Sequence, residues 1–326
     1  MEQPSSPLAL PPSALATIRE ALSCVVLGTI ISTAVYGLTV LQAYIYFRHN
    51  NTSPRTRYFV AFLFALDTAT IILTLYGFYD DFVTHFDDVL SFLKIPGTLA
   101  LENLLTVLIG LLTQCFFAHR IWALSKGNVL LVSSIVILAL CSFGPGVAIS
   151  AHLWINTYIF SLGSLEVRML AGFANGLSVI CDLLIAAAMC MYLNTKRTGF
   201  RRTDSIIDRL MMYAINRGLL TATCQACHMI LTIAFPGRLI YFPFALLDGK
   251  LYCNTLLATL NAQRAMRGDE PNIIEVGSHM LNPIDSSTAG HGSRRTLHGK
   301  LDSASASMPS IRKDFSGAGK AMVSRQ

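Results

Sequence analysis

Long apolar stretches alternate with short polar segments along most of the chain. A helix that crosses a bilayer needs about 20 predominantly apolar residues, and seven stretches meet that requirement. The pattern therefore predicts an all-α fold, an integral membrane bundle of seven transmembrane helices. The expected spans are Ala21–Phe47, Tyr58–Tyr79, Thr98–Ile121, Asn128–Ile149, Met169–Leu193, Tyr213–Phe235 and Leu239–Ala262.

The last three stretches carry additional local signals. Pro236-Gly237-Arg238 separates the sixth from the seventh and predicts a tight turn, because proline and glycine favour turns. Thr203-Asp204-Ser205 offers good N-cap residues, so the sixth helix is expected to begin there, ahead of its apolar stretch. Gly172 and Gly176 lie four residues apart in the fifth stretch, a spacing that lets a neighbouring helix approach closely.

The composition supports a membrane domain. Of the 326 residues, 53% are hydrophobic and 13% are charged, and the mean hydropathy is +0.52, whereas soluble domains carry about 25% charged residues. We expect the seven-helix domain at residues 21–262, after an extracellular N-terminal segment at residues 1–20. Residues 263–326 lose the apolar periodicity and are rich in small and polar residues, which predicts a disordered cytosolic tail.

Lys and Arg gather at alternate helix ends, and their distribution indicates the orientation of the bundle. The richer side is expected in the cytosol, with the N-terminus outside and the C-terminus in the cytosol. The net charge of +6 then reflects topology, and we expect no nucleic-acid partner. The richer side carries Arg48, Arg55, Arg57, Arg120, Lys126, Lys196, Arg197, Arg201, Arg202, Arg209, Arg264 and Arg267, and the other side carries Arg19, Lys94, Arg168 and Arg238.

The lipid bilayer is the first expected partner, in the plasma membrane or another membrane of the secretory pathway. The basic run before the sixth helix is expected to contact anionic headgroups. It consists of Lys196, Arg197, Arg201 and Arg202. Two overlapping glycosylation sequons begin at Asn50 and Asn51, in a connection that this orientation places in the cytosol, where they cannot be used.

Polar residues inside the expected spans are the candidate functional residues. A charge at the centre of a span costs about 2.5–3.5 kcal/mol on insertion scales, so each charged side chain is expected to face the bundle interior. We expect them to line a hypothetical cavity for a small ligand. The candidates are Asp67, Glu102, Asp182, Arg217, His228, Asp248, Lys250 and Asn254.

Depth in the membrane predicts one ion pair. Asp67 and Lys250 lie near the middle of the second and seventh spans, which are neighbours in a serpentine seven-helix bundle, so we expect them to pair. Asp248 lies two residues from Lys250 and therefore about 200° around the same helix. Asp248 needs a partner from another helix.

Two further contacts are possible at other depths. Glu102 and His228 both lie in the outer halves of their spans and could face each other, and Asp182 could contact Arg217. Such pairs either hold the bundle together or line a polar cavity for a ligand, an ion or a proton. Both interpretations remain open from the sequence.

The leading functional interpretation is a receptor- or sensor-like membrane protein with a small ligand inside the bundle. The alternatives are a carrier or channel for a small solute or proton, and a structural scaffold. The sequence contains no phosphate loop, nucleophile elbow or HExxH motif, and we expect no enzymatic activity. Cys224 to His228 match the CxxCH pattern of haem attachment but lie inside an apolar helix, so we expect no cofactor and no metal site.

Two long motifs in the last two spans resemble a known family. They are Arg202-Thr203-Asp204-Ser205-Ile206-Ile207 with Gly218-Leu219-Leu220-Thr221, and Gly249-Lys250-Leu251-Tyr252 with Leu256-Leu257-Ala258-Thr259-Leu260-Asn261-Ala262. Over about residues 175–264 the chain resembles a large membrane-protein family of mushroom-forming (basidiomycete) fungi, catalogued only as a domain of unknown function. The resemblance implies a fungal, multi-pass, non-enzymatic protein and brings no ligand. Arg217 departs from the small polar residue that family members tend to have.

Overall fold

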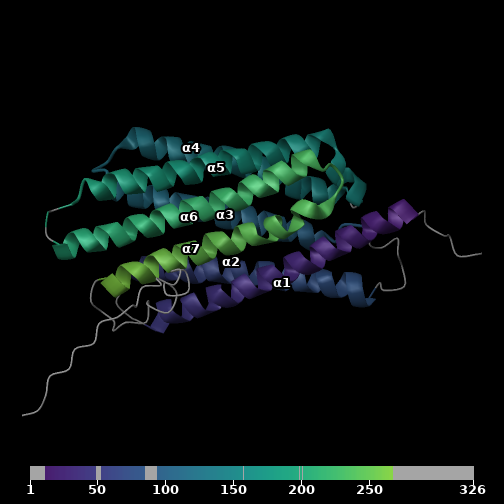
Figure 1. The fold of residues 1–326 in the computed structure, drawn as a ribbon, viewed down its shortest axis with the longest axis horizontal. Helices are drawn as coiled ribbons and strands as arrows, with labels where there is room; N and C mark the ends of the chain where they lie inside the picture. Colours follow the sequence, from purple (N-terminus) through teal and green to yellow (C-terminus); the bar gives the residue numbers. More distant parts are fainter. Residues whose placement is uncertain are drawn as a thin grey trace, which may run out of the picture. The chain divides into compact units, whose positions relative to one another are not determined.

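The computed structural model describes residues 12–48, 53–84, 94–156, 158–197, 199 and 201–266. Within them the chain forms seven α-helices that lie side by side along one long axis (Figure 1). Their bounds are α1 Pro12–Arg48, α2 Pro54–Tyr79, α3 Gly97–Leu124, α4 Val129–Ile155, α5 Leu165–Asn194, α6 Arg201–Ala234 and α7 Phe242–Met266. Three short helical turns accompany them: η1 Asp80–Thr84, η3 Ile159–Gly163 and η4 Leu239–Tyr241.

Helices that follow one another in the chain also pack against one another, and α7 closes the bundle by packing on α1 and α3. In Figure 1, α4 and α5 lie along one edge, α1 and α2 along the opposite edge, and α3, α6 and α7 between them. Most of the connections are short, and successive helices are antiparallel. We call the end with the α6–η4–α7 connection the Arg238 end, and the end with the α5–α6 connection the Arg197 end.

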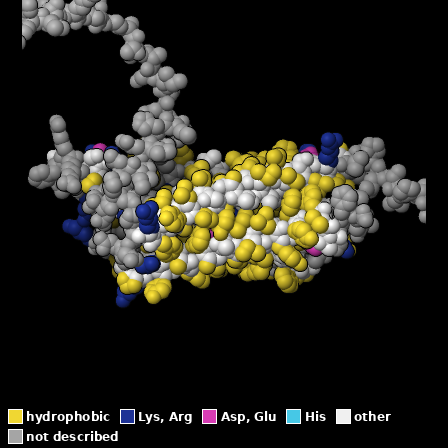
Figure 2. Space-filling model, turned by 90° about the horizontal axis from the view of Figure 1, so that it is seen from below, with side chains coloured by type: hydrophobic (Ala, Val, Ile, Leu, Met, Phe, Trp, Pro, Cys, Tyr) yellow, Lys and Arg dark blue, Asp and Glu magenta, His cyan; other side chains and the backbone are white. Residues whose placement is uncertain are grey.

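The outer surface is that of a membrane-embedded protein. Figure 2 shows hydrophobic side chains in a broad band across the middle of one face, with Lys and Arg near the two ends. Five of the described helical segments are long and apolar enough to cross a membrane. They are Ala16–Arg48, Pro54–Thr84, Gly97–Leu124, Val129–Ile155 and Leu165–Asn194.

The two remaining helices, α6 and α7, carry more polar side chains, and the surroundings of α7 explain why that helix tolerates them. From Leu239 to Arg264, no described residue has an exposed side chain. Helix α7 therefore contacts other helices along its length, and its polar residues are sheltered from the outer surface. Mean hydropathy alone underestimates the ability of such a helix to lie inside a membrane domain, because it does not distinguish contact with protein from contact with lipid.

The local signals in this region predicted the helix limits well. Helix α6 begins at Arg201, near the expected cap and well ahead of the apolar stretch. Gly237 has a φ of +77°, a left-handed conformation that glycine adopts readily, in the expected turn after α6. Pro243 follows directly after the first residue of α7, where proline leaves no hydrogen bond unmade.

Helices α5 and α6 approach closely at a glycine that the spacing rule did not select. A Cβ added at Gly218 would lie 2.5 Å from the Ala186 Cβ. Gly172 and Gly176 also face α6, but an added Cβ would lie 3.5 Å from Ile233 Cδ1 and 3.4 Å from Met229 Sδ, respectively. These two positions have room for a methyl group, and Gly218 has none.

Candidate ligand-binding cavity

A cavity of about 470 Å³ extends from the Arg238 end into the bundle. All seven helices contribute to its walls, which are mostly apolar. Polar side chains line its inner end, among them Gln114 of α3 and Tyr252 of α7. A largely apolar pocket of several hundred Å³ with a few convergent polar groups is typical of small-molecule sites.

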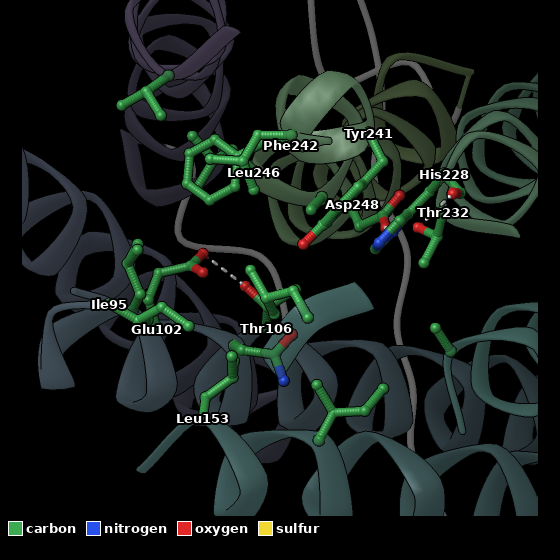
Figure 3. Close-up of a pocket in the computed structure, with 18 of the residues that line it drawn as sticks. Ile95, Glu102, Thr106, Leu153, His228, Thr232, Tyr241, Phe242, Leu246 and Asp248 are labelled. Atoms are coloured by element: carbon green, nitrogen blue, oxygen red, sulfur yellow. Dashed lines mark hydrogen bonds and ion pairs between the residues drawn. The ribbon is translucent and has the colours of Figure 1, made fainter. Parts of the chain in front are cut away.

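One wall carries Glu102 of α3, which is 6% exposed. Thr106, one turn further along the helix, donates a hydrogen bond from its hydroxyl to Glu102 Oε1 over 2.9 Å. Figure 3 shows the carboxylate directed into the cavity. Thr106 is held in place by α7, because Gly249 lets that helix come so near that an added Cβ would lie 3.0 Å from Thr106 Oγ1.

The opposite wall carries His228 of α6 and Asp248 of α7. His228 Nδ1 lies 2.9 Å from Asp248 Oδ2, and the imidazole stacks on the ring of Tyr241 with 5.5 Å between centroids. Figure 3 shows this group across the cavity from Glu102. Glu102 and His228 therefore line one cavity, but the partner of His228 is Asp248. The two helices that carry this pair are joined by a short turn, which brings both side chains to the same depth.

The inner end of the cavity is a hydrogen-bonded polar layer. Tyr252 Oη donates to Asp182 Oδ2 over 2.9 Å and accepts from Gln225 Nε2 over 2.6 Å. Gln114 Nε2 donates to the same Tyr252 oxygen over 3.2 Å and to Ser178 Oγ over 3.1 Å. The candidate residues named from the sequence did not include Gln114, Ser178 and Gln225, although uncharged polar residues inside apolar stretches are a usable signal.

The expected Asp67–Lys250 ion pair is confirmed. Lys250 Nζ lies 3.0 Å from Asp67 Oδ1, and the two side chains are 1% and 0% exposed, respectively. The ammonium also donates hydrogen bonds to the hydroxyl of Thr70 and to the Asp67 carbonyl oxygen over 3.3 Å. With these three acceptors Lys250 is fully engaged within the bundle.

The possible contact between Asp182 and Arg217 is also present. Arg217 Nη2 lies 3.6 Å from Asp182 Oδ1, and the guanidinium carbon lies 3.4 Å from the centroid of the Phe117 ring. Asp182 connects this pair to the polar layer through Tyr252. The layer therefore joins the cavity to a buried cation on its other side.

The cavity includes only some of the residues that the sequence singled out. Three of the eight predicted residues line the cavity: Glu102, His228 and Asp248. The remaining five are absent from its walls and lie behind them or beyond the polar layer; they are Asp67, Asp182, Arg217, Lys250 and Asn254. Four of these five form the two buried ion pairs, so their first role is to neutralise one another.

Near the outer limit of the cavity, α1 is tied to the α6–α7 connection. Arg238 Nε donates to Glu20 Oε1 over 2.9 Å, and Arg238 Nη2 contacts the second oxygen of the same carboxylate. The hydrogen bonds to Glu20 raise the pKa of Arg238 above its ordinary value. Because the ordinary pKa of arginine already lies far above physiological pH, the guanidinium is charged and keeps its ion pair with Glu20.

One stretch of the sequence matches a known family, and it supplies most of the polar layer and of the ion pairs. Residues 178–265 match DUF6534, a family of unknown function. The DUF6534 region covers most of α5, all of α6 and nearly all of α7. It contains Asp182, Arg217, His228, Asp248, Lys250 and Asn254.

The DUF6534 region does not contain the whole cavity. Glu102, Thr106 and Gln114 come from α3, and Asp67 comes from α2, all of them before residue 178. One wall of the cavity and one half of the Asp67–Lys250 pair therefore lie outside the matched region. Comparison with curated proteins and with solved structures finds no match.

Proposed function

We propose that this chain is a receptor- or sensor-like multi-pass membrane protein that binds a small ligand in the cavity at its Arg238 end. The proposal includes seven membrane crossings. Helices α6 and α7 pack between five helices that are apolar enough to span a bilayer. Large apolar side chains such as Met212, Leu219 and Ile230 face outward from α6, beside the exposed polar residues Asn216 and Thr223. Helix α7 has no exposed side chain between residues 239 and 264.

The orientation follows from the charges at the two ends. The Arg197 end holds most of the described Lys and Arg residues, and such an excess is typical of the cytosolic side. The cavity then opens toward the extracellular or lumenal side, where a sensor meets its ligand. The basic residues Lys196, Arg197, Arg201 and Arg202 contact anionic headgroups, and Arg197 also forms an ion pair with Asp208 of α6.

The observation that carries ligand binding is that the cavity stops at the polar layer. Beyond Tyr252 the bundle is filled by core side chains such as Phe117, Ile121 and Leu256, each at most 2% exposed. A carrier or channel needs a path to the opposite side, and the packed half of the bundle favours a binding site over a path. The proposal assigns the polar residues to binding and stability, with no catalytic role.

Thermal unfolding of the full-length protein in detergent tests the proposal. A panel of amines, alcohols, carboxylates and membrane lipids is added, because a compound that binds only the folded protein raises Tm. At a concentration 100 times its Kd, a ligand stabilises by about 2.7 kcal/mol. We expect at least one class of compound to raise Tm.

Two variants on one helix locate the site. Ala174 of α5 lines the cavity and Ala187 of the same helix is exposed on its outer face. Ala174→Phe is expected to abolish the ligand-induced rise in Tm, and Ala187→Phe to preserve it. Retention of the rise in Ala174→Phe would place the ligand elsewhere. Passage of the same ligand across proteoliposome membranes would instead support the carrier alternative.

A further inference from the structure

The inner part of the cavity is acidic. The charged residues around the whole cavity are Glu20, Asp81, Lys94, Glu102, Arg238 and Asp248. Both cationic residues lie near the Arg238 end, where Arg238 is already paired with Glu20. Further in, Glu102 and Asp248 face the cavity from opposite walls (Figure 3), and the described lining there contains no Lys or Arg.

Each of these two carboxylates is incompletely satisfied within the described part of the chain. Glu102 is 6% exposed, and Thr106 supplies its one hydrogen bond, to Oε1. Asp248 is 7% exposed and its Oδ2 contacts His228. Its Oδ1 is buried without a nitrogen or oxygen donor, and only the weakly donating Cys224 thiol interacts with the carboxylate there. Burial of a carboxylate is unfavourable unless charge or hydrogen bonds compensate it. Lys250 attracts the Glu102 carboxylate electrostatically, but the hydrogen bonds of its ammonium go to Asp67 and Thr70.

We infer that the ligand is an organic cation, a protonated amine or quaternary ammonium on an apolar body, whose positive group lies between Glu102 and Asp248. This inference rests on the proposed function and names the ligand class. The charged group meets two carboxylates, while the apolar body fills the remaining volume of the mostly apolar cavity. Tyr241 and Phe242 place aromatic rings on the same wall as Asp248, and such rings attract ammonium groups.

A bare metal ion fits the same residues poorly. Among the described residues, no group of three or more His, Cys, Asp or Glu side chains lies close enough to hold a metal. The cavity of about 470 Å³ is also far larger than an ion, and its apolar walls would leave the ion without ligands. A cation with a substantial apolar part matches both the charge and the volume.

Matched ligands that differ in charge test this inference on the full-length protein in detergent. Three triads are compared by Tm and by titration: hexylamine, hexanol and hexanoate; 2-phenylethylamine, 2-phenylethanol and phenylacetate; cyclohexylmethylamine, cyclohexylmethanol and cyclohexanecarboxylate. We expect the amine to bind most tightly in at least one triad and the carboxylate to bind least. This comparison needs only the wild-type protein, so it does not depend on the folding of any variant.

Variants then locate the positive group. Glu102→Gln and Asp248→Asn keep the shape and remove the charge, and each is expected to weaken amine binding about tenfold or more while changing alcohol binding little. Glu166→Gln is the matched control, because Glu166 is an exposed carboxylate on the first turn of α5 that does not line the cavity. Equal amine affinity in Glu102→Gln and Glu166→Gln would overturn the placement.

The outcomes separate this inference from the proposed function. If an alcohol or a carboxylate binds most tightly and its binding is lost in Ala174→Phe, the ligand is not a cation but the cavity is still its binding site. Binding by some member of the broader panel but by none of the amines would lead to the same conclusion. Absence of binding by every compound of both sets would overturn both the proposed ligand-binding function of the cavity and the proposed cationic ligand.

Discussion

Lys250 illustrates how single residues are accommodated in this bundle. Its ammonium lies at the centre of α7 with 1% of the side chain exposed, and its acceptors come from Asp67 and Thr70 of α2. The Arg217 guanidinium is likewise stabilised by the Asp182 carboxylate and by the ring of Phe117. At the scale of the residue, therefore, a deep cation is stabilised by a carboxylate on another helix.

Lys250→Met is expected to destabilise the protein by about 3–5 kcal/mol, because it leaves Asp67 buried without a counter-charge. Unfolding in a denaturing detergent, followed by circular dichroism, measures the change in the free energy of unfolding. The double variant Asp67→Asn with Lys250→Met removes both charges and should recover much of the loss. A single variant as stable as the wild type would show that the pair contributes nothing.

At the scale of the helix, Gly218 allows α6 to pack closely against α5. An added Cβ at Gly218 meets the Ala186 Cβ at 2.5 Å and the Asp182 carbonyl oxygen at 3.3 Å. Asp182 also anchors the polar layer through Tyr252. Gln225 of α6 bonds the same Tyr252 hydroxyl. A shift of α6 away from α5 at this point would therefore disturb the polar layer at the inner end of the cavity.

Gly218→Ala is expected to destabilise the protein by about 1–3 kcal/mol through overpacking, although alanine favours helices by about 1 kcal/mol over glycine. Gly172→Ala is the control, because 3.5 Å separates its added Cβ from Ile233 Cδ1. That control should be neutral or slightly stabilising. The same unfolding assay measures both, and equal effects of the two changes would contradict the close approach at Gly218.

The two ends of the whole molecule differ in charge and in content. The Arg238 end contains the cavity, and the Arg197 end contains packed core and most of the basic residues. A protein with this asymmetry can bind a ligand on one side of the bilayer and present a basic surface on the other. The polar layer and the Asp182–Arg217 pair lie between these two halves.

Glycosylation mapping tests the proposed orientation. A sequon introduced on an N-terminal extension is expected to be modified, and the natural sequons at Asn50 and Asn51 are expected to stay unmodified. Their connection lies outside the described residues, but it joins α1 to α2 at the Arg197 end. Treatment with an endoglycosidase reveals each glycan as a change in gel mobility. Glycans at Asn50 or Asn51 would invert the proposed orientation.

The sequence by itself determined the helical elements. Helix limits follow from apolar length, prolines and caps, which are properties of neighbouring residues, so α2 ends at Tyr79 and α6 begins near Thr203 as expected. Helix α1 differs, because it begins at Pro12, ahead of the expected Ala21. The sequence also determined the Asp67–Lys250 pair. When two opposite charges lie at the same depth on helices that are expected to be neighbours, each has few other possible partners.

Only the tertiary structure decided which polar residues surround a cavity. The sequence suggested Glu102 as the partner of His228, whereas the rotation and tilt of α6 and α7 place His228 Nδ1 2.9 Å from Asp248 Oδ2. Those rotations depend on how side chains from several helices interlock, as at Gly218 and Ala186, and such packing is a property of the whole bundle. The volume left between the walls is set in the same way, so no local pattern in the sequence specifies it.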